Sequence, residues 1–320
     1  MNNLKKVGLT ALATSLITTS AFAGAVSVTG SASINLANQS NSTQSNGFSS
    51  GDSLNFSGSG ELDNGMTVTM KQEIDGGVMD DRSVAISMDG MGTLTFNNHG
   101  GSSAMSAVDD VMPTAYGESW DVLGSTAQTT AGRASKEGSI GGFATDNNFF
   151  YTAPEMVEGL AVKASYTPSG TSRPDGSVSF NLEYTGVEGL TIGYAEDDNG
   201  LAGTSKLEND TAYIKYAFGS FTVGMQESQQ EQAGATTSDD EFSAVGVTYQ
   251  VNDDLTIGYH SSERDFGDKA QDQENTNLSI AYTTGGVTIS AAMVEMNNVG
   301  GSTLADDDTD GFAVDVAFAF

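Results

Sequence analysis

Carboxylates are the most numerous side chains in this sequence that could bind or attract ions. The 320 residues include 42 Asp and Glu against 12 Lys and Arg, a formal net charge of −30 at pH 7. Such a chain repels phosphate backbones, so nucleic acid is excluded as a partner. The sequence has no Cys and two His, which excludes disulfides and thiol nucleophiles and leaves little for a metal centre or catalytic triad.

The candidate residues are densest in the stretch 99–146. It holds the acids Asp109, Asp110, Glu118 and Asp121, followed by Glu137 and Asp146, against the bases Arg133 and Lys136. A surface with this excess of carboxylates raises the local concentration of cations. Calcium at acidic loops, as in Asp306–Asp308 and Asp239–Glu241, stays an open alternative to solvated carboxylates. No other cofactor or metal is predicted.

Catalytic residues are not expected. His99 and His260 lie far apart in the sequence and in no recognisable motif, and the sequence contains no G-x-S-x-G. The prediction is therefore that the protein is not an enzyme.

The N-terminus has the organisation of a secretory signal peptide. Lys5 and Lys6 precede a short apolar run, and Ala21 and Ala23 occupy the two small-residue positions of a cleavage site. The run is too short for a membrane-spanning helix, which needs about 20 residues. We expect 1–23 to be removed by cleavage near Ala23, leaving one domain, 24–320.

The rest of the chain alternates with a period of two, which is typical of strands with one apolar and one polar or small face. In the last ten residues Phe312, Val314 and Val316 share one parity, and Ala313 and Asp315 share the other. Sixteen such segments are predicted: 25–37, 52–61, 65–74, 81–89, 92–98, 147–153, 159–167, 177–185, 189–196, 210–217, 219–227, 241–250, 253–261, 275–283, 286–295 and 310–320. Short links alternate with long ones, and Asp75–Asp80 is counted among the long.

Two all-β architectures bury such strands differently. In a soluble sandwich the apolar face is inside, whereas in a transmembrane barrel it faces lipid and the lumen is polar. An exported chain with 38% hydrophobic residues, alternating link lengths and Tyr residues at strand ends favours the barrel. The fold prediction is a 16-stranded antiparallel up-and-down transmembrane β-barrel, which leaves an aqueous channel. A sandwich or repeat adhesin is the alternative.

With these features the sequence resembles the general-diffusion porins of Gram-negative outer membranes, particularly the alphaproteobacterial type. The resemblance rests on Val26–Ile34 as a first strand, Gly90–Phe96 before the long link, Asn148–Glu155 with Val157–Tyr166 after it, and the terminal Phe320. It implies a homotrimer in the outer membrane, in contact with lipid and lipopolysaccharide, and passive passage of ions and small hydrophilic solutes.

The resemblance also implies roles for single residues. The long third loop, 99–146, would fold into the lumen as a constriction that carries Asp109, Asp110, Glu118 and Asp121. Lys71, Lys163 and Lys215 have lumen parity and are candidates for the basic wall. Phe320 would be the signal for the barrel assembly machinery. This basic wall is thinner than the arginine-rich wall of the family pattern.

The functional prediction is a water-filled porin channel that prefers cations, because the charge of the chain is strongly negative. Two alternatives remain open: a solute-selective porin, and a secreted or surface β-rich adhesin without a channel. A sugar-selective channel would need several lumen aromatics, and Tyr213 is the best candidate of few.

Overall fold

The computed structural model describes residues 26–40, 47–108, 110–123, 138–143, 146–171, 173–234, 239–303 and 308–320. The predicted signal peptide, 1–23, and the cleavage site lie outside these residues. The three helices of the described part are single 3₁₀ turns, η1 (Met105–Val108), η2 (Gly203–Ser205) and η3 (Val299–Gly301). None has the length and hydropathy to cross a membrane.

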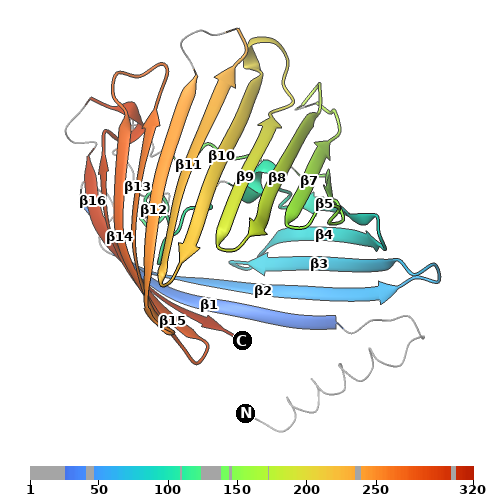
Figure 1. Ribbon diagram of the computed structural model, residues 1–320, viewed down its shortest axis with the longest axis horizontal. Coiled ribbons are helices and arrows are strands. Elements are labelled where there is room, and N and C mark those ends of the chain that lie inside the picture. The colour runs from blue at the N-terminus through green and yellow to red at the C-terminus, as the bar shows by residue number, and fades with distance from the viewer. Residues whose placement is uncertain are drawn as a thin grey trace.

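Sixteen antiparallel strands form one closed barrel (Figure 1). Each strand pairs with its neighbours along the chain, and β1 pairs with β16, from Ser31 opposite Ala319 to Gln39 opposite Gly311. The strands are β1 (Val26–Gln39), β2 (Gly47–Glu61), β3 (Thr67–Asp75), β4 (Val78–Met88), β5 (Gly92–His99), β6 (Asn148–Thr152), β7 (Leu160–Thr167), β8 (Ser177–Val187), β9 (Leu190–Asp198), β10 (Leu207–Phe218), β11 (Phe221–Gln232), β12 (Asp240–Asn252), β13 (Leu255–Asp265), β14 (Gln273–Thr284), β15 (Val287–Asn297) and β16 (Thr309–Ala319). The predicted number of strands and the up-and-down order are confirmed.

The two faces of the wall follow the sequence alternation. In β14, Leu278 is 60% exposed on the outer face, whereas its neighbour Asn277 is 1% exposed on the inner face. An apolar outer face and a polar inner face are the arrangement of a transmembrane barrel, because lipid surrounds the barrel and the interior is polar.

Aromatic side chains gather on the outer face at one short turn. Tyr216 and Phe218 of β10 stack with ring centroids 5.7 Å apart, and Phe221 of β11 continues the row to Tyr249 of β12. All four rings are exposed. Aromatic girdles of this kind lie at the membrane–water interfaces of barrels.

Two features of the strand boundaries differ from the prediction. The segment Asp75–Asp80 is not a long link: β3 and β4 are joined by Gly76 and Gly77 alone, with φ values of +56° and +81°. Two glycines at positive φ make the tight turn that suits a hairpin. Several strands also extend further towards the long links, as β2 does to Gly47 and β11 to Gln232.

Candidate functional site

The long link between β5 and β6 lies against the polar inner face of the barrel. Backbone N–H groups of Ala104 and Met105 donate to Ser165 Oγ of β7 (3.1 Å) and Ser179 Oγ of β8 (2.9 Å). Further along, the Asn277 amide of β14 donates to the carbonyl oxygens of Tyr116 (3.3 Å) and Gly117 (2.9 Å). The described parts of this link, 100–108, 110–123 and 138–143, are called the inner loop below.

Apolar contacts add to this attachment. Met105, Val108, Met112, Trp120 and Ile140 of the inner loop are buried in one cluster with Tyr213, Phe242 and Ala244 of the wall. Val122 and Leu123 are buried in a second cluster with residues of β15 and β16. The inner loop is thus bound to the wall by packing as well as by hydrogen bonds.

Three strand glycines make room for the inner loop. A Cβ on Gly246 would lie 2.5 Å from the Pro113 carbonyl oxygen, one on Gly224 2.6 Å from Pro113 Cδ, and one on Gly258 2.7 Å from Ala115 N. Glycine inside a strand often marks a close approach of another backbone. In the sequence these residues resemble other strand glycines, although glycines of inward parity in β11, β12 and β13 were a usable signal.

The predicted acids occupy different environments. Asp109 lies outside the described residues. Asp110 and Asp121 are exposed, whereas Glu118 is 3% exposed. A turn in which Asp121 N–H donates to the Glu118 carbonyl oxygen (3.0 Å) brings these two residues together, and ligand atoms of all three carboxylates lie within 4.8 Å of one another.

The Glu118 carboxyl group has an unusual electrostatic setting. Its Oε1 accepts the Met112 N–H (3.1 Å), and its Oε2 is buried with no hydrogen-bond donor among the described residues. Burial, the adjacent Asp110 and the charge of Asp121 raise the pKa of Glu118 to about 10. This setting favours the neutral form of the carboxyl group.

The three predicted lysines share the inward parity but differ in exposure. Lys71 of β3 is exposed, and Lys163 of β7 and Lys215 of β10 are half-buried. Lys215 Nζ lies 5.5 Å from the centroid of the Tyr213 ring. The structure does not bring the three lysines together, because they lie on separate strands of the wall.

The wall contains a basic residue that sequence reasoning missed. Arg264 of β13 donates to Asp240 Oδ2 (2.7 Å) and to the Gly138 carbonyl oxygen of the inner loop (3.1 Å). Inward parity was the signal that could have identified it. Because Arg264 is 9% exposed and its guanidinium is paired, the side chain attaches the loop rather than presenting a free charge.

The two histidines have separate contacts. His260 of β13 is fully buried, and its Nδ1 accepts from Ser119 N–H (3.3 Å) and lies 3.0 Å from Ser119 Oγ. Its Nε2 has no hydrogen-bond partner among the described residues. His99 Nδ1 lies 3.1 Å from Asp146 Oδ2, a contact that lowers the pKa of Asp146.

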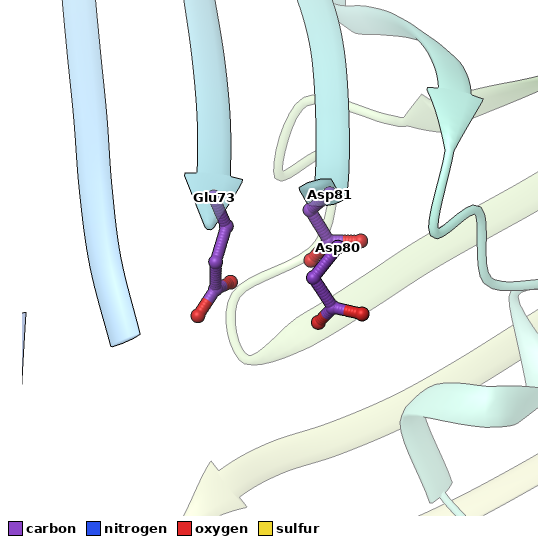
Figure 2. Close-up of side chains that lie close together, drawn as sticks. All are labelled: Glu73, Asp80 and Asp81. Atoms are coloured by element: carbon purple, nitrogen blue, oxygen red, sulfur yellow. The ribbon is translucent and has the colours of Figure 1, made fainter. Parts of the chain in front are cut away.

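A second group of acids lies where β3 ends and β4 begins. Figure 2 shows Glu73 on β3 facing Asp80 and Asp81 on β4. Their ligand atoms also lie within 4.8 Å of one another. None of these side chains is buried, and Glu73 Oε1 accepts the Ser53 hydroxyl (2.5 Å).

Phe320 follows the last strand and continues its pairing. Its N–H donates to the Gly30 carbonyl oxygen (2.9 Å), and its carbonyl oxygen accepts the Gly30 N–H (2.8 Å). The side chain is 73% exposed on the outer surface. These bonds place the C-terminus at the seam where β1 and β16 close the barrel.

Several solved structures with this architecture are porins or other outer-membrane proteins. An anion-selective porin from Comamonas acidovorans superposes with a TM-score of 0.70 at 14% identity, over 93% of this chain and 100% of the other. OmpT of Vibrio cholerae gives 0.67 at 14% identity, over 93% and 98%. A mutant porin of Rh. blastica gives 0.64 at 15% identity, over 92% and 100%. No curated protein sequence matched the chain.

A closed 16-stranded barrel with a polar inner face and an apolar outer face defines an outer-membrane channel protein of the porin class. The family model described as Gram-negative porin matches residues 8–302. The chain therefore belongs to the Gram-negative porin family, as the sequence resemblance indicated.

Proposed function

We propose that the protein forms a water-filled channel for passive diffusion of ions and small hydrophilic solutes, with a preference for cations. The observation that carries this proposal is an acidic inner loop held against the polar inner face of a closed barrel. Charged side chains near a narrow part of a pore set its ion selectivity. The inner loop would act as the constriction, with Asp110 and Asp121 as its exposed charges.

The fold alone does not determine the sign of the selectivity, since one porin of similar fold is anion-selective. The cation preference rests on the exposed loop acids and on wall acids such as Glu73 and Asp315, against Lys71, Lys163 and Lys215. Tyr213, the best candidate for stacking a sugar, is 3% exposed and is covered in the cluster with the inner loop. This favours a general channel over a sugar-selective one.

The channel proposal is tested by single-channel conductance and reversal potential in planar bilayers under a KCl gradient. A reversal potential that favours potassium is the expected result. Conductance with chloride preference would contradict the cation preference but keep the channel. Folded barrels that give no conductance would contradict the channel and favour the adhesin alternative.

The proposal extends to assembly and export. A homotrimer is supported by an OmpT structure of Vibrio cholerae described as a trimer form, and conductance steps in groups of three would test it. Cleavage near Ala23 is tested by N-terminal sequencing of the mature protein. Recognition of Phe320 by the assembly machinery is tested by deleting it and measuring the amount of folded barrel in outer membranes.

We propose that this channel has no enzymatic activity. His260 is the histidine nearest to a hydroxyl nucleophile, Ser119, but its Nε2 has no partner among the described residues. A catalytic histidine needs a carboxylate or similar group to orient the second nitrogen. The contact between Ser119 of the inner loop and His260 of β13 accounts for both residues without catalysis.

A further inference from the structure

The turn that carries two acids of the inner loop is bound to a histidine of the wall. Ser119 lies in this turn, in which the Asp121 N–H donates to the Glu118 carbonyl oxygen (3.0 Å). The Ser119 N–H donates to Nδ1 of the fully buried His260 (3.3 Å), and Ser119 Oγ lies 3.0 Å from the same nitrogen. One imidazole nitrogen therefore joins the wall to the turn 118–121.

These contacts define the protonation state of the imidazole. A backbone N–H can only donate, so Nδ1 of His260 must carry a lone pair and the proton is assigned to Nε2. The neighbouring side chains fit this assignment, because the Asn275 amide donates to Ser262 Oγ (3.0 Å) and Ser262 Oγ lies 3.0 Å from Ser119 Oγ. Each hydroxyl can then donate to the next, and the chain of hydrogen bonds ends on Nδ1.

Protonation of His260 would remove this acceptor. An imidazolium carries a proton on both nitrogens, so Nδ1–H would face the Ser119 N–H and the backbone hydrogen bond would be lost. The hydroxyl chain can reverse its direction, but the backbone N–H cannot. Nε2 offers no compensation, since it has no hydrogen-bond partner among the described residues. An unpaired charge is costly to bury, so a protonated His260 favours a state in which the turn has left the wall and water reaches the ring.

In the described part of the chain, no counter-ion contacts the imidazole of His260. The inward-facing residues beside it on β12 and β14 are uncharged: Ala244, Gly246, Thr248, Asn275, Asn277 and Ser279. On its own strand, Arg264 is paired with Asp240 (2.7 Å). On the inner loop, the setting of Glu118 favours the neutral form, and Asp121 is exposed. Since Nδ1 contacts Ser119 and Nε2 contacts no polar group of these residues, no ion pair stabilises the protonated form against the wall.

We propose that His260 is a positioning residue for the constriction and that acid releases the turn 118–121 from it. Neutral His260 holds this turn against the wall. A turn that leaves the wall can only move towards the lumen, so its release narrows the channel. The change in conductance rests on the proposed channel function, whereas the release of the turn does not.

Quenching of Trp120 fluorescence by acrylamide tests the release. Trp120 is the single Trp of the chain, is 4% exposed, and packs edge-on against the His260 ring with centroids 5.1 Å apart. In the detergent-solubilised full barrel, quenching should be weak at pH 5 and should increase as the pH falls to 3. His260→Asn should lose this increase, because asparagine places Oδ1 close to the position of Nδ1 but is not protonated in this range. All carboxyl groups are the same in the two proteins, so the difference between their profiles reports on His260.

Two further variants sharpen this test. His260→Phe keeps a ring but removes the acceptor, so its Trp120 should be quenched strongly already at pH 5. His99→Gln is the matched control: it removes the other histidine of the chain, which lies 3.1 Å from Asp146, and should keep the wild-type increase.

Two results would overturn the proposal: an increase of wild-type size in His260→Asn, or no increase in the folded wild-type barrel. If His260→Asn does not fold, as judged by its heat-dependent shift in gel mobility, His260→Gln replaces it with the same expected loss.

Single-channel conductance then separates the role of His260 from the channel. From pH 5 to 3 the conductance of the wild type should fall more than that of His260→Asn. Equal falls would contradict the narrowing through His260 and keep the channel. Acid-dependent quenching that His260→Asn loses, without conductance at any pH, would support the release of the turn and contradict the channel.

Discussion

The inner faces of the two halves of the barrel differ in what covers them. No residue of β1 to β5, all of which the structure describes, is buried. The strands β8 to β14 instead carry buried polar side chains on their inner face, among them Asn181, Gln226, His260 and Asn277. The inner loop lies on the second half and reaches the first half at β1, where Asn35 donates to the Tyr116 hydroxyl (3.0 Å) and Gln39 donates to the Leu123 carbonyl oxygen (2.9 Å). Similar polar strands thus have two roles: one half binds the loop, and the other faces the solvent-filled side.

The largest expected effect comes from a Cβ on the covered half. Gly246→Ala would place its Cβ 2.5 Å from the Pro113 carbonyl oxygen, so the loop or the strand must move. Overpacking of this kind costs about 1–3 kcal/mol. We expect a lower midpoint for heat unfolding, followed by gel mobility, and altered single-channel conductance.

Gly58→Ala on β2 is the control for this prediction. Its Cβ would meet Val26 Cγ2 at 3.6 Å, an ordinary contact, so stability and conductance should stay close to wild type. Equal effects of the two variants would show that the inner loop does not depend on the close approach at Gly246.

A polar truncation should have a somewhat smaller effect. Asn277→Ala removes the amide that donates to the Tyr116 and Gly117 carbonyl oxygens, at a cost of about 1–2 kcal/mol. Asn55→Ala on the open half removes an amide that donates to the nearby Ser53 hydroxyl (3.0 Å) and should cost less. Hydrogen exchange of the inner-loop amides is the measurement. Unchanged protection in Asn277→Ala would contradict the attachment.

Charge reversal should change ion selectivity more on the open half of the barrel than on the covered half. Lys71→Glu changes an exposed charge on the open half, so the reversal potential in a KCl gradient should shift towards potassium. Lys215→Glu changes a half-buried charge beside the inner loop and should shift it less. Both shifts should shrink with salt, because the screening length falls to about 3 Å at 1 M. A larger shift from Lys215→Glu would place the narrow part of the pore on the covered half.

The inner loop should also show a pH dependence. The pKa of Glu118 is raised to about 10, so the folded loop binds a proton that the unfolded chain releases near the ordinary carboxyl pKa. Stability is then complete below that ordinary value and falls as pH rises towards 10. Raising the pH from 5 to 9 should lower the protection of inner-loop amides in the wild type. Glu118→Gln should show a flatter profile, and identical profiles would contradict the raised pKa.

The strands were predictable where one face meets lipid and the other meets water. In β14 the alternation of Leu278 and Ile280 with Asn277 and Ser279 is visible in the sequence, and the predicted segment 275–283 lies within the observed strand. Prediction stopped short where both faces are polar. The end of β11, from Ser228 to Gln232, pairs with its neighbours but carries no apolar alternation, because hydrogen bonding continues beyond the apolar belt.

The candidate site was predictable as a region but not as an arrangement. The length and acidity of 99–146 indicated a functional loop, and inward parity selected Lys71, Lys163 and Lys215. Nothing local distinguishes Glu118 from Asp121, although one is buried and the other exposed. In the sequence, glycines such as Gly246 look like ordinary strand residues, because the backbone that requires them is more than a hundred positions away.

The sequence by itself determined the sixteen strands, the polar inner face and the excess of negative charge. These follow from a period of two and from composition, which depend on neighbouring residues alone. The tertiary structure decided which half of the wall the loop covers, which carboxyl group is buried and where three acids converge. Those outcomes depend on contacts between the loop and strands that are distant in the sequence. Such contacts exist only in the closed barrel.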